Sequence, residues 1–306
     1  MIDKSNLEFL NSFANEVIEH ILNRVMPMVS NTRELLLTDS NNNLLSSHPN
    51  PLNRCGRKIF SQNDEDGITY EIVRRLGLDS GVFAEFGVGN GLENNTIALA
   101  ALGWKGFWVG GEDLAFQLDD NKAVGKNNFS FFKSWITREN ILSLTREGLS
   151  SISEQKIDVL SLDLDGNDYY LIEELLKGGI SPKLFIVEYN AKFPPPIRWK
   201  IDYNPQHRWG GDDYFGASIS SFSDLFEKHG YFLVCCNAYT GSNAFFVHSS
   251  HKHLFLDIPQ DIRALWSPPR YFLLHHYGHP ISPKSVEVIF RELNKPTDIV
   301  FRSAKH

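Results

Sequence analysis

The stretch VFAEFGVGNG, at residues 82–91, decides the fold of this chain. Its first half is apolar and suits a short buried strand. Its second half places Gly87, Gly89 and Gly91 ahead of a segment with helical periodicity, residues 92–102. Glycine lets a backbone turn sharply and approach a ligand closely. Because ligands of parallel α/β sheets bind beyond the carboxyl ends of the strands, the stretch predicts one such strand with a ligand site at its end.

Strand and helix signals alternate along the chain around this turn. Further strands are predicted at residues 107–109, 129–132, 158–162 and 184–188. Further helices are predicted at residues 64–77, 138–149, 168–177 and 219–229. The last two strands, 231–236 and 244–247, are too close for a helical crossover and should be antiparallel. We therefore expect an α/β fold with a doubly wound, mostly parallel, Rossmann-like sheet of seven strands.

The chain is expected to have three parts. Residues 1–57 contain an N-terminal helix, over residues 5–28, and a linker rich in Asn and Ser. Residues 58–250 form the α/β domain, and residues 251–306 form a C-terminal extension packed on the core. Ser5 and Glu8 form a capping box at the start of the N-terminal helix. Its apolar stripe suggests packing on the core or on a second copy of the chain, so a homo-oligomer is one hypothesis.

Composition narrows the classes of partner. The 306 residues carry a formal net charge of −7 and no basic run, which argues against binding to nucleic acid or to anionic lipid. No apolar stretch approaches the roughly 20 residues that cross a bilayer, and the N-terminus lacks the basic region of a signal peptide. Cys55, Cys235 and Cys236 fit neither a disulfide framework nor a metal-binding spacing. We expect a cytoplasmic protein that acts on a small molecule, without a membrane or nucleic-acid partner.

The glycine spacing distinguishes between two kinds of nucleotide-binding turn. A dinucleotide fingerprint reads G-x-G-x-x-G, whereas residues 87–91 read G-x-G-x-G with Glu85 two positions earlier. Glu85 stands at the end of the strand, where it could bind an amine or a hydroxyl. This spacing resembles the first motif of class I methyltransferases, in which the turn passes under the methionine and ribose parts of S-adenosylmethionine.

Three further segments follow in the expected order: SQNDED at residues 61–66, GWKGFWV at residues 103–109 and DVLSLDLDG at residues 158–166. Together they resemble FkbM-type methyltransferases. The resemblance implies S-adenosylmethionine-dependent O-methylation, often of saccharides or secondary metabolites, and thus a role such as polysaccharide modification. It also implies a set of cofactor-binding residues: Gln62, Glu85, Gly87, Gly89, Asn90 and Gly91.

One position departs from the family pattern. The second strand usually ends in an acidic residue that binds the ribose hydroxyls of the cofactor. Here Gly110 and Gly111 follow Val109, and Glu112 comes next. If the two glycines form a bulge, Glu112 reaches the ribose. Otherwise ribose binding is altered, or the protein has lost the cofactor. The alternative for Glu112 itself is a solvated loop carboxylate.

Acidic residues follow two strands that should be neighbours. Asp163, Asp165 and Asp168 come at and after the end of the strand at residues 158–162, and Glu188 ends the strand at residues 184–188. Carboxylates that face one cleft repel each other unless protons or a cation compensate. Asp163, Asp165 and Glu188 are therefore candidate ligands of Mg²⁺, and Asp163 and Asp165 are candidate catalytic groups. The alternative is that these residues cap a helix and contact the cofactor, as the position of Asp168 suggests.

The long connection at residues 191–216 suits a lid over the substrate. Its aromatic rings could stack on a sugar, and Arg208 could bind hydroxyls or a phosphate. His207 is a candidate general base, because a histidine titrates near neutrality. The alternative for His207 is an ordinary surface histidine. Two further groups, His248, His251 and His253, and then His275, His276 and His279, lack the partners that would indicate zinc.

Two other functions stay open on this sequence. The first is a non-catalytic binding or assembly protein on a methyltransferase-like fold, which the missing acid directly after Val109 favours. The second is a phosphatase, because DLDG at residues 163–166 matches the start of the haloacid-dehalogenase motif. That motif normally lies on the first strand and continues with Thr or Val, whereas here it lies in mid-chain and continues with Asn167.

Overall fold

The structure is a computed structural model that describes residues 12–19, 23, 28, 32, 39–116, 128–270 and 279–293. The chain divides into two units, Met1–Ser47 and His48–His306. In the first unit, residues 12–19 and 39–46 are helical. The expected capping box at Ser5 and Glu8 lies outside the described residues, as do most of the remaining positions of the helix expected at residues 5–28.

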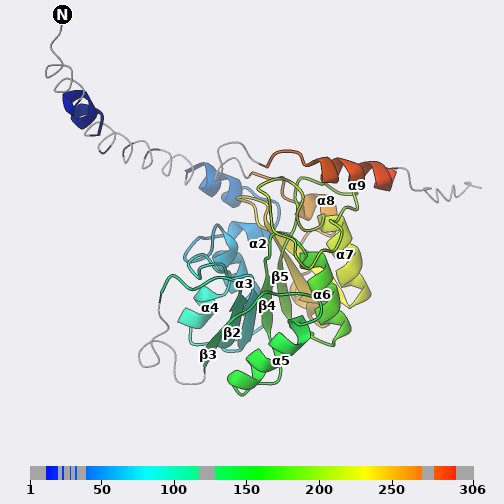
Figure 1. Cartoon of the computed structure of the whole chain (residues 1–306). Coiled ribbons are helices and arrows are strands. Elements are labelled where there is room, and N and C mark those ends of the chain that lie inside the picture. The colour runs from blue at the N-terminus through cyan, green and yellow to red at the C-terminus, as the bar shows by residue number, and fades with distance from the viewer. Residues whose placement is uncertain are drawn as a thin grey trace, which may run out of the picture. The chain divides into compact units, whose positions relative to one another are not determined.

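The second unit is built on a seven-stranded sheet with the strand order β3-β2-β1-β4-β5-β7-β6 (Figure 1). Its strands are β1 (Val82–Phe86), β2 (Lys105–Gly110), β3 (Phe129–Lys133), β4 (Val159–Leu162), β5 (Leu184–Glu188), β6 (Tyr231–Cys236) and β7 (Asn243–His248). Strands β1 to β5 pair in parallel, whereas β7 is antiparallel to both β5 and β6. The predicted doubly wound, mostly parallel sheet is therefore confirmed.

Helices cover both faces of this sheet (Figure 1). One face packs against α2 (Pro51–Arg54), α3 (Glu65–Arg75), α4 (Ile97–Ala101) and α8 (Ile262–Leu265). The other packs against α5 (Ile141–Ser151), α6 (Asp168–Lys177) and α7 (Ile219–Lys228). The 3₁₀ helix η1 (Ser249–Leu254) and α9 (Pro283–Leu293) follow the last strand and α8 respectively. None of the described helices is long and apolar enough to cross a membrane.

Burial on both faces explains why β1 is an apolar run rather than an alternating one. Ala84 and Phe86 face the helices α5 to α7, and Phe83 faces α3 and α4. All five residues of β1 are buried. Only Glu85 breaks the apolar run, so this carboxylate must find its hydrogen-bond donors inside the protein.

Two segments differ most from the sequence-based expectation. Helix α4 covers Ile97–Ala101 rather than residues 92–102, because Glu85 accepts hydrogen bonds from the backbone of Asn95 and Thr96 and holds that segment as a turn. Helix α2 lies in the segment expected to be a linker. Its Asn53 donates to the carbonyl of Cys236 at 2.8 Å. The polar residues of this segment therefore bind edge strand β6 and are not simply solvent-exposed.

The strand order also fixes where a ligand should bind. The chain runs from β1 outward to β2 and β3 and then crosses to β4 on the other side of β1. This reversal leaves a crevice outside the carboxyl ends of β1 and β4. Open α/β sheets bind ligands at such a point.

Candidate functional site

A cavity of about 380 Å³, here called the main cleft, opens at the carboxyl ends of β1, β4 and β5. The turn after β1 lines it with residues 87–90, and the following loop adds Glu93, Asn94 and Asn95. Its other lining residues come from across the unit: Gln62, Glu85, Asp163, Asp165, Glu188, Trp209, Ser242, Asn243 and His279. The lining is therefore predominantly polar and acidic.

The glycine turn brings the backbone to the edge of this cleft. Gly87 has a φ of 91°, and a Cβ atom there would overlap the carbonyl oxygen of Asp163, so the turn and the end of β4 can approach only through glycine. Gly89 has a φ of 50°, and nothing lies within 4 Å of where its Cβ would be. Gly91 donates to the carbonyl of Val88 at 2.8 Å and closes the turn without lining the cleft.

Glu85 lies at the base of the cleft and is held by internal donors. One carboxylate oxygen accepts from the backbone of Asn95 at 2.9 Å, and the other accepts from the backbone and hydroxyl of Thr96 at 3.1 and 2.5 Å. The Thr96 hydroxyl also accepts from the Trp108 indole at 2.8 Å. Burial raises the pKa of Glu85. In this arrangement Glu85 fixes the loop that lines the cleft, a role that its position on the strand alone did not reveal.

The segment that holds Gln62 is shaped by Asp66. One carboxylate oxygen of Asp66 accepts from three successive backbone N–H groups, those of Ile59, Phe60 and Ser61, at 2.8, 2.6 and 2.8 Å. This compact turn presents the neighbouring Gln62 to the main cleft. The SQNDED motif therefore contributes to the cleft through its own local hydrogen bonds.

The same segment is tied to the turn between β6 and β7 by two buried carboxylates. Asp64 accepts from the backbone of Ala238 at 3.0 Å, and Glu65 accepts from the side-chain amides of Asn237 and Asn243 at 3.0 and 3.1 Å. Burial, together with the charge of Asp64, raises the pKa of Glu65 to about 7. Because β7 is antiparallel, its first residue, Asn243, pairs with Glu188 at the carboxyl end of β5.

Sequence reasoning missed Asn243 as a cleft residue, together with its neighbour Ser242. The usable signal was the predicted antiparallel pairing of the last two strands. A strand that runs against the parallel ones begins at the edge where they end, so the turn before it lies beside their carboxyl termini.

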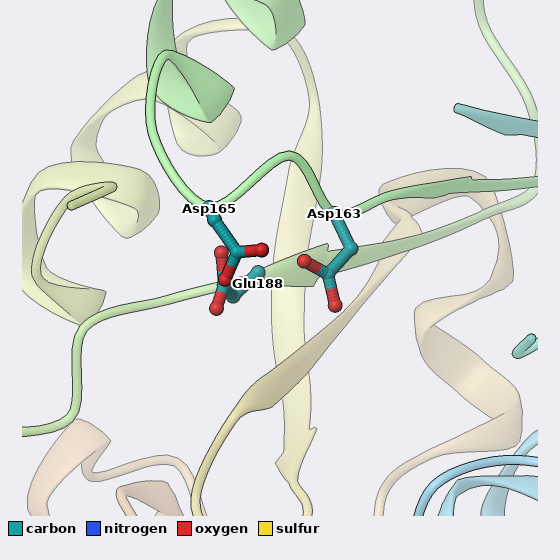
Figure 2. A group of neighbouring side chains, drawn as sticks. All are labelled: Asp163, Asp165 and Glu188. Carbon is teal, nitrogen blue, oxygen red and sulfur yellow. The ribbon is translucent and has the colours of Figure 1, made fainter. Parts of the chain in front are cut away.

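Three carboxylates, here called the acidic trio, gather at the ends of β4 and β5: Asp163, Asp165 and Glu188 (Figure 2). Each offers an oxygen that lies within 4.8 Å of the others. Asp165 adopts a φ of 51°, which is rare for a residue other than glycine. Glu188 is buried, and its Oε2 has no hydrogen-bond partner. Within the described part of the chain, this is the one group of His, Cys, Asp and Glu side chains spaced to hold a metal.

Burial raises the pKa of all three carboxylates. Burial raises the pKa of Asp163 and of Glu188 well above the usual range, and the charges of neighbouring carboxylates raise both further. The Asp165 side chain is exposed to the cleft, yet partial burial by the surrounding protein also raises its pKa. An arrangement of this kind retains protons or takes up a cation, because fully ionised carboxylates would repel each other.

Asp168, the fourth acidic residue of this region, does not face the cleft. Its two oxygens accept from the backbone of Leu164 and Gly166, each at 2.8 Å. It thus fixes the turn that carries Asp165 at the start of α6. Burial raises the pKa of Asp168 to about 7, against the opposing effect of these hydrogen bonds.

A second, smaller cavity of about 80 Å³ lies beyond the ends of β2 and β3. It shares no lining residue with the main cleft. Its walls combine apolar and polar groups: Gly111, Ser134, Trp135, Ile136, Leu164, Asn167, Leu171 and His207. We call it the small cavity.

His207 belongs to the small cavity and is absent from the lining of the main cleft. Its ring packs on Gly166, where a Cβ atom would overlap it. The ring is hydrogen-bonded to the backbone of Asp165, and burial lowers the pKa of His207 despite that bond. The structure therefore places His207 behind the acidic trio and in contact with the turn that carries Asp165.

Glu112 is exposed and lines neither cavity. The pairing of β2 with β3 continues without a register shift as far as Gly110 and Lys133. The two glycines therefore form no bulge within the strand, contrary to the geometry that would have brought Glu112 back toward the sheet. Gly111, its neighbour, does line the small cavity.

Some aromatic and basic residues of the loop after β5 pack within the protein, and one lines the main cleft. Trp199 is buried and stacks on Phe193 with ring centroids 4.1 Å apart. Arg208 lies over the Trp135 ring, 5.0 Å from its centroid, rather than in the cleft. Trp209 alone among the loop's residues lines the main cleft.

The histidine groups of the C-terminal part are not metal sites in the described residues. His248, His251 and His253 lie on and beside η1. His279 lines the main cleft, whereas His275 and His276 lie outside the described residues.

Comparisons with known proteins find no sequence relative. No model of a known protein family matches the chain, and no curated protein matches its sequence. Several solved structures are similar over part of the chain, among them the following three. Precorrin-6y C5,15-methyltransferase from Geobacter metallireducens GS-15 is 10% identical with a TM-score of 0.33, over 63% of this chain and 91% of that one.

The second, CalO1, a methyltransferase in calicheamicin biosynthesis in its SAH-bound form, is 13% identical with a TM-score of 0.33, over 59% of this chain and 56% of that one. The third is the N-terminal domain of EvdMO1 in the presence of SAH and D-fucose, 10% identical with a TM-score of 0.34, over 63% of this chain and 89% of that one. Similarity at this level does not establish a function for this chain.

Proposed function

We propose that this protein is an S-adenosylmethionine-dependent O-methyltransferase. The main support for this proposal is the turn at residues 87–91. It follows the interior strand β1 at the point where the strand order reverses. Gly89 faces open space there, and the backbone around it lines a cavity of about 380 Å³. A turn of this kind lets a ligand lie directly against the main chain.

We place the methionine part of the cofactor over Gly87, Gly89 and Asn90, beside Gln62. Glu85 supports this surface through the loop at residues 93–96 rather than as a free ligand. We place the adenine ring at the small cavity, where Trp135, Ile136 and Leu164 offer apolar surface and Ser134 and Asn167 offer polar groups. We place the ribose between the two cavities, on the side of Gly111.

The acidic trio marks the acceptor side of the cleft. Its residues suit Mg²⁺, because carboxylate oxygens are the ligands that this ion prefers and Glu188 Oε2 has no other partner. Asp163, Asp165 and Glu188 are the residues that would hold it. When bound, such an ion lowers the pKa of an acceptor hydroxyl and orients it.

The chain's own residues can orient and deprotonate the acceptor. The hydroxyl oxygen attacks the methyl carbon, the bond from that carbon to sulfur breaks, and S-adenosylhomocysteine leaves as the neutral thioether. The hydroxyl proton passes to Asp163 or Asp165, two of the carboxylates that line the cleft. His207, which contacts the turn behind Asp165, acts on that residue's position. A saccharide or a related small molecule with several hydroxyls suits this polar lining, and proximity supplies much of the rate.

One observation favours a second candidate, a non-catalytic binding or assembly protein on the same fold. Glu112 is exposed instead of facing the cleft, so the expected ribose ligand is out of position. A folded protein that fails to bind S-adenosylhomocysteine would select this candidate.

The experiment compares two glycines in the same backbone conformation. Gly89 and Gly77 both have positive φ, 50° and 67°, and neither has an atom within 4 Å of a Cβ position, but only Gly89 lines the cleft. Asparagine tolerates this conformation. We expect Gly89→Asn to weaken S-adenosylhomocysteine binding at least tenfold by titration calorimetry, because its side chain occupies the ligand's path, and Gly77→Asn to bind like the wild type. Equal affinity of the two variants would contradict the proposed cofactor position.

A further inference from the structure

Three aromatic rings, here called the aromatic corner, meet at the main cleft: Trp209, Phe215 and His279. The His279 ring lies edge-to-face against both of the others, with centroids 4.9 Å from Trp209 and 5.4 Å from Phe215. Phe215 is buried, whereas Trp209 and His279 are half-buried and line the cleft. The corner therefore presents two ring surfaces to the cavity and is backed by the third.

The segment that carries His279 is fastened to the loop after β5 through Asp213. This buried carboxylate accepts from the backbone of Ser282 and the hydroxyl of Ser285, each at 2.7 Å. Its other oxygen pairs with the Lys192 ammonium at 2.6 Å, and the same ammonium donates to the carbonyl of His279 at 3.3 Å. A buried, fully bonded carboxylate holds its partners in one arrangement. His279 is thus placed in the cleft by specific bonds.

The aromatic corner shares the main cleft with the acidic trio, on the side of β5. Asn190, two residues after Glu188, donates its amide to the carbonyls of Asp213 and Phe215 at 2.9 and 3.1 Å. The small cavity, where we place the adenine, is lined by none of these residues. The corner and the trio together therefore border the part of the cleft that the proposed cofactor leaves free.

We infer that the aromatic corner and the acidic trio form the acceptor subsite, and that it selects an uncharged or cationic hydroxyl compound over an anionic one. This inference rests on the proposed methyltransferase function. Ring faces such as that of Trp209 attract an apolar face or a cation. The acidic trio lines the same cleft, and three ionised carboxylates keep one negative charge even around a Mg²⁺. The trio therefore favours hydroxyl or ammonium groups on the acceptor and disfavours a carboxylate or phosphate. Trp209 and His279 are the specificity-determining residues.

The test measures methyl transfer from isotope-labelled S-adenosylmethionine to three probes that share a pyranose ring but differ in charge. The probes are methyl glucoside, which is neutral, glucosamine, which is cationic, and glucuronate, which is anionic. We expect transfer to the first two to exceed transfer to glucuronate at least tenfold. Trp209→Ala and His279→Ala should each lower transfer at least tenfold, mainly by raising KM for the probe.

S-adenosylhomocysteine affinity, measured by calorimetry on the same proteins, distinguishes an effect on the acceptor subsite from an effect on the cofactor site. This affinity should change less than threefold in Trp209→Ala and His279→Ala. The control variant His253→Ala, which removes an exposed histidine of η1, should match the wild type in both methyl transfer and affinity. Four results would overturn the inference: efficient transfer to glucuronate, full activity in both corner variants, a parallel loss of cofactor affinity, or no transfer to any probe by a wild type that binds the cofactor. A wild type that binds no cofactor would instead refute the proposed function.

Discussion

Individual side chains in this protein act mainly through the loops that they hold. Glu85 and His207 show this most clearly, because both were expected to act directly on ligands. In the structure, Glu85 binds the backbone of Asn95 and Thr96, and His207 contacts the turn that carries Asp165. Sequence identifies the residue type at a strand end or in a loop. It does not identify their hydrogen-bond partners, which lie 10 and 42 residues away along the chain and meet them only in the folded protein.

The Glu85 carboxylate should be essential to stability. Glu85→Gln replaces one acceptor oxygen by an amide that would face N–H donors, and leaving those groups unpaired costs about 1–3 kcal/mol. We therefore expect a loss of that size in the free energy of unfolding by urea titration, and a larger loss in Glu85→Ala. A Gln variant as stable as the wild type would show that the donors at Asn95 and Thr96 do not depend on the carboxylate.

A positioning role for His207 predicts that a hydrogen-bond donor is what matters there. Asparagine offers an N–H donor and leucine does not, so His207→Asn should retain most of kcat for methyl transfer and His207→Leu should lose about tenfold or more. The retained activity of the Asn variant should keep the wild-type pH profile. Equal loss in both variants, with a flattened profile, would instead identify His207 as the general base.

At the scale of elements, the cleft depends on contacts between segments that are distant in sequence. The strands and the helices α6 and α7 could be predicted because apolar periodicity and turn residues are local signals. Helix α2 and the start of α4 could not, since Asn53 and Glu85 form their decisive bonds with β6 and with the loop after β1. For the same reason the sequence showed Gln62 but not the buried network that joins its segment to Asn243.

That network makes stability depend on pH. The pKa of Glu65 is raised to about 7 in the folded protein, whereas an unfolded glutamate titrates near ~4.3. Between these values the folded state keeps a proton that the unfolded state releases, so this contribution to stability is complete at low pH and is lost as pH rises toward 7.

We therefore expect the free energy of unfolding to fall between pH 5 and pH 8, and to fall less steeply in Glu65→Gln, which has no proton to lose. Urea titrations of both proteins across this range provide the measurement. An identical pH dependence in the two proteins would place the titrating groups elsewhere.

In the molecule as a whole, the sheet topology determines where the candidate catalytic residues lie. The alternation of strands and helices predicted the seven-stranded fold, and the fold predicted that Asp163 and Glu188 would meet at one edge. What lay beyond prediction was the contribution of remote segments, such as His279 from the C-terminal part and Trp209 from the loop after β5. Side-chain packing rather than periodicity places those residues.

The crowding of the acidic trio predicts opposite effects with and without Mg²⁺. Glu188→Gln removes one carboxylate from the cluster, so the metal-free variant should be more stable than the wild type at pH 8. Mg²⁺ should raise the melting temperature of the wild type by binding the folded state and should leave that of the variant nearly unchanged. Thermal unfolding with and without millimolar Mg²⁺ checks both effects. A melting temperature that rises equally in the two proteins would locate the ion outside the trio.

The most direct measurement is a crystal structure of the protein with S-adenosylhomocysteine. We expect the methionine part over the turn at residues 87–91 and the adenine in the small cavity beside Trp135, with Trp209 and His279 facing the part of the main cleft that the cofactor leaves open. A ligand bound at another site, or a main cleft that stays empty at saturating S-adenosylhomocysteine, would contradict the assignment of this cleft to the cofactor.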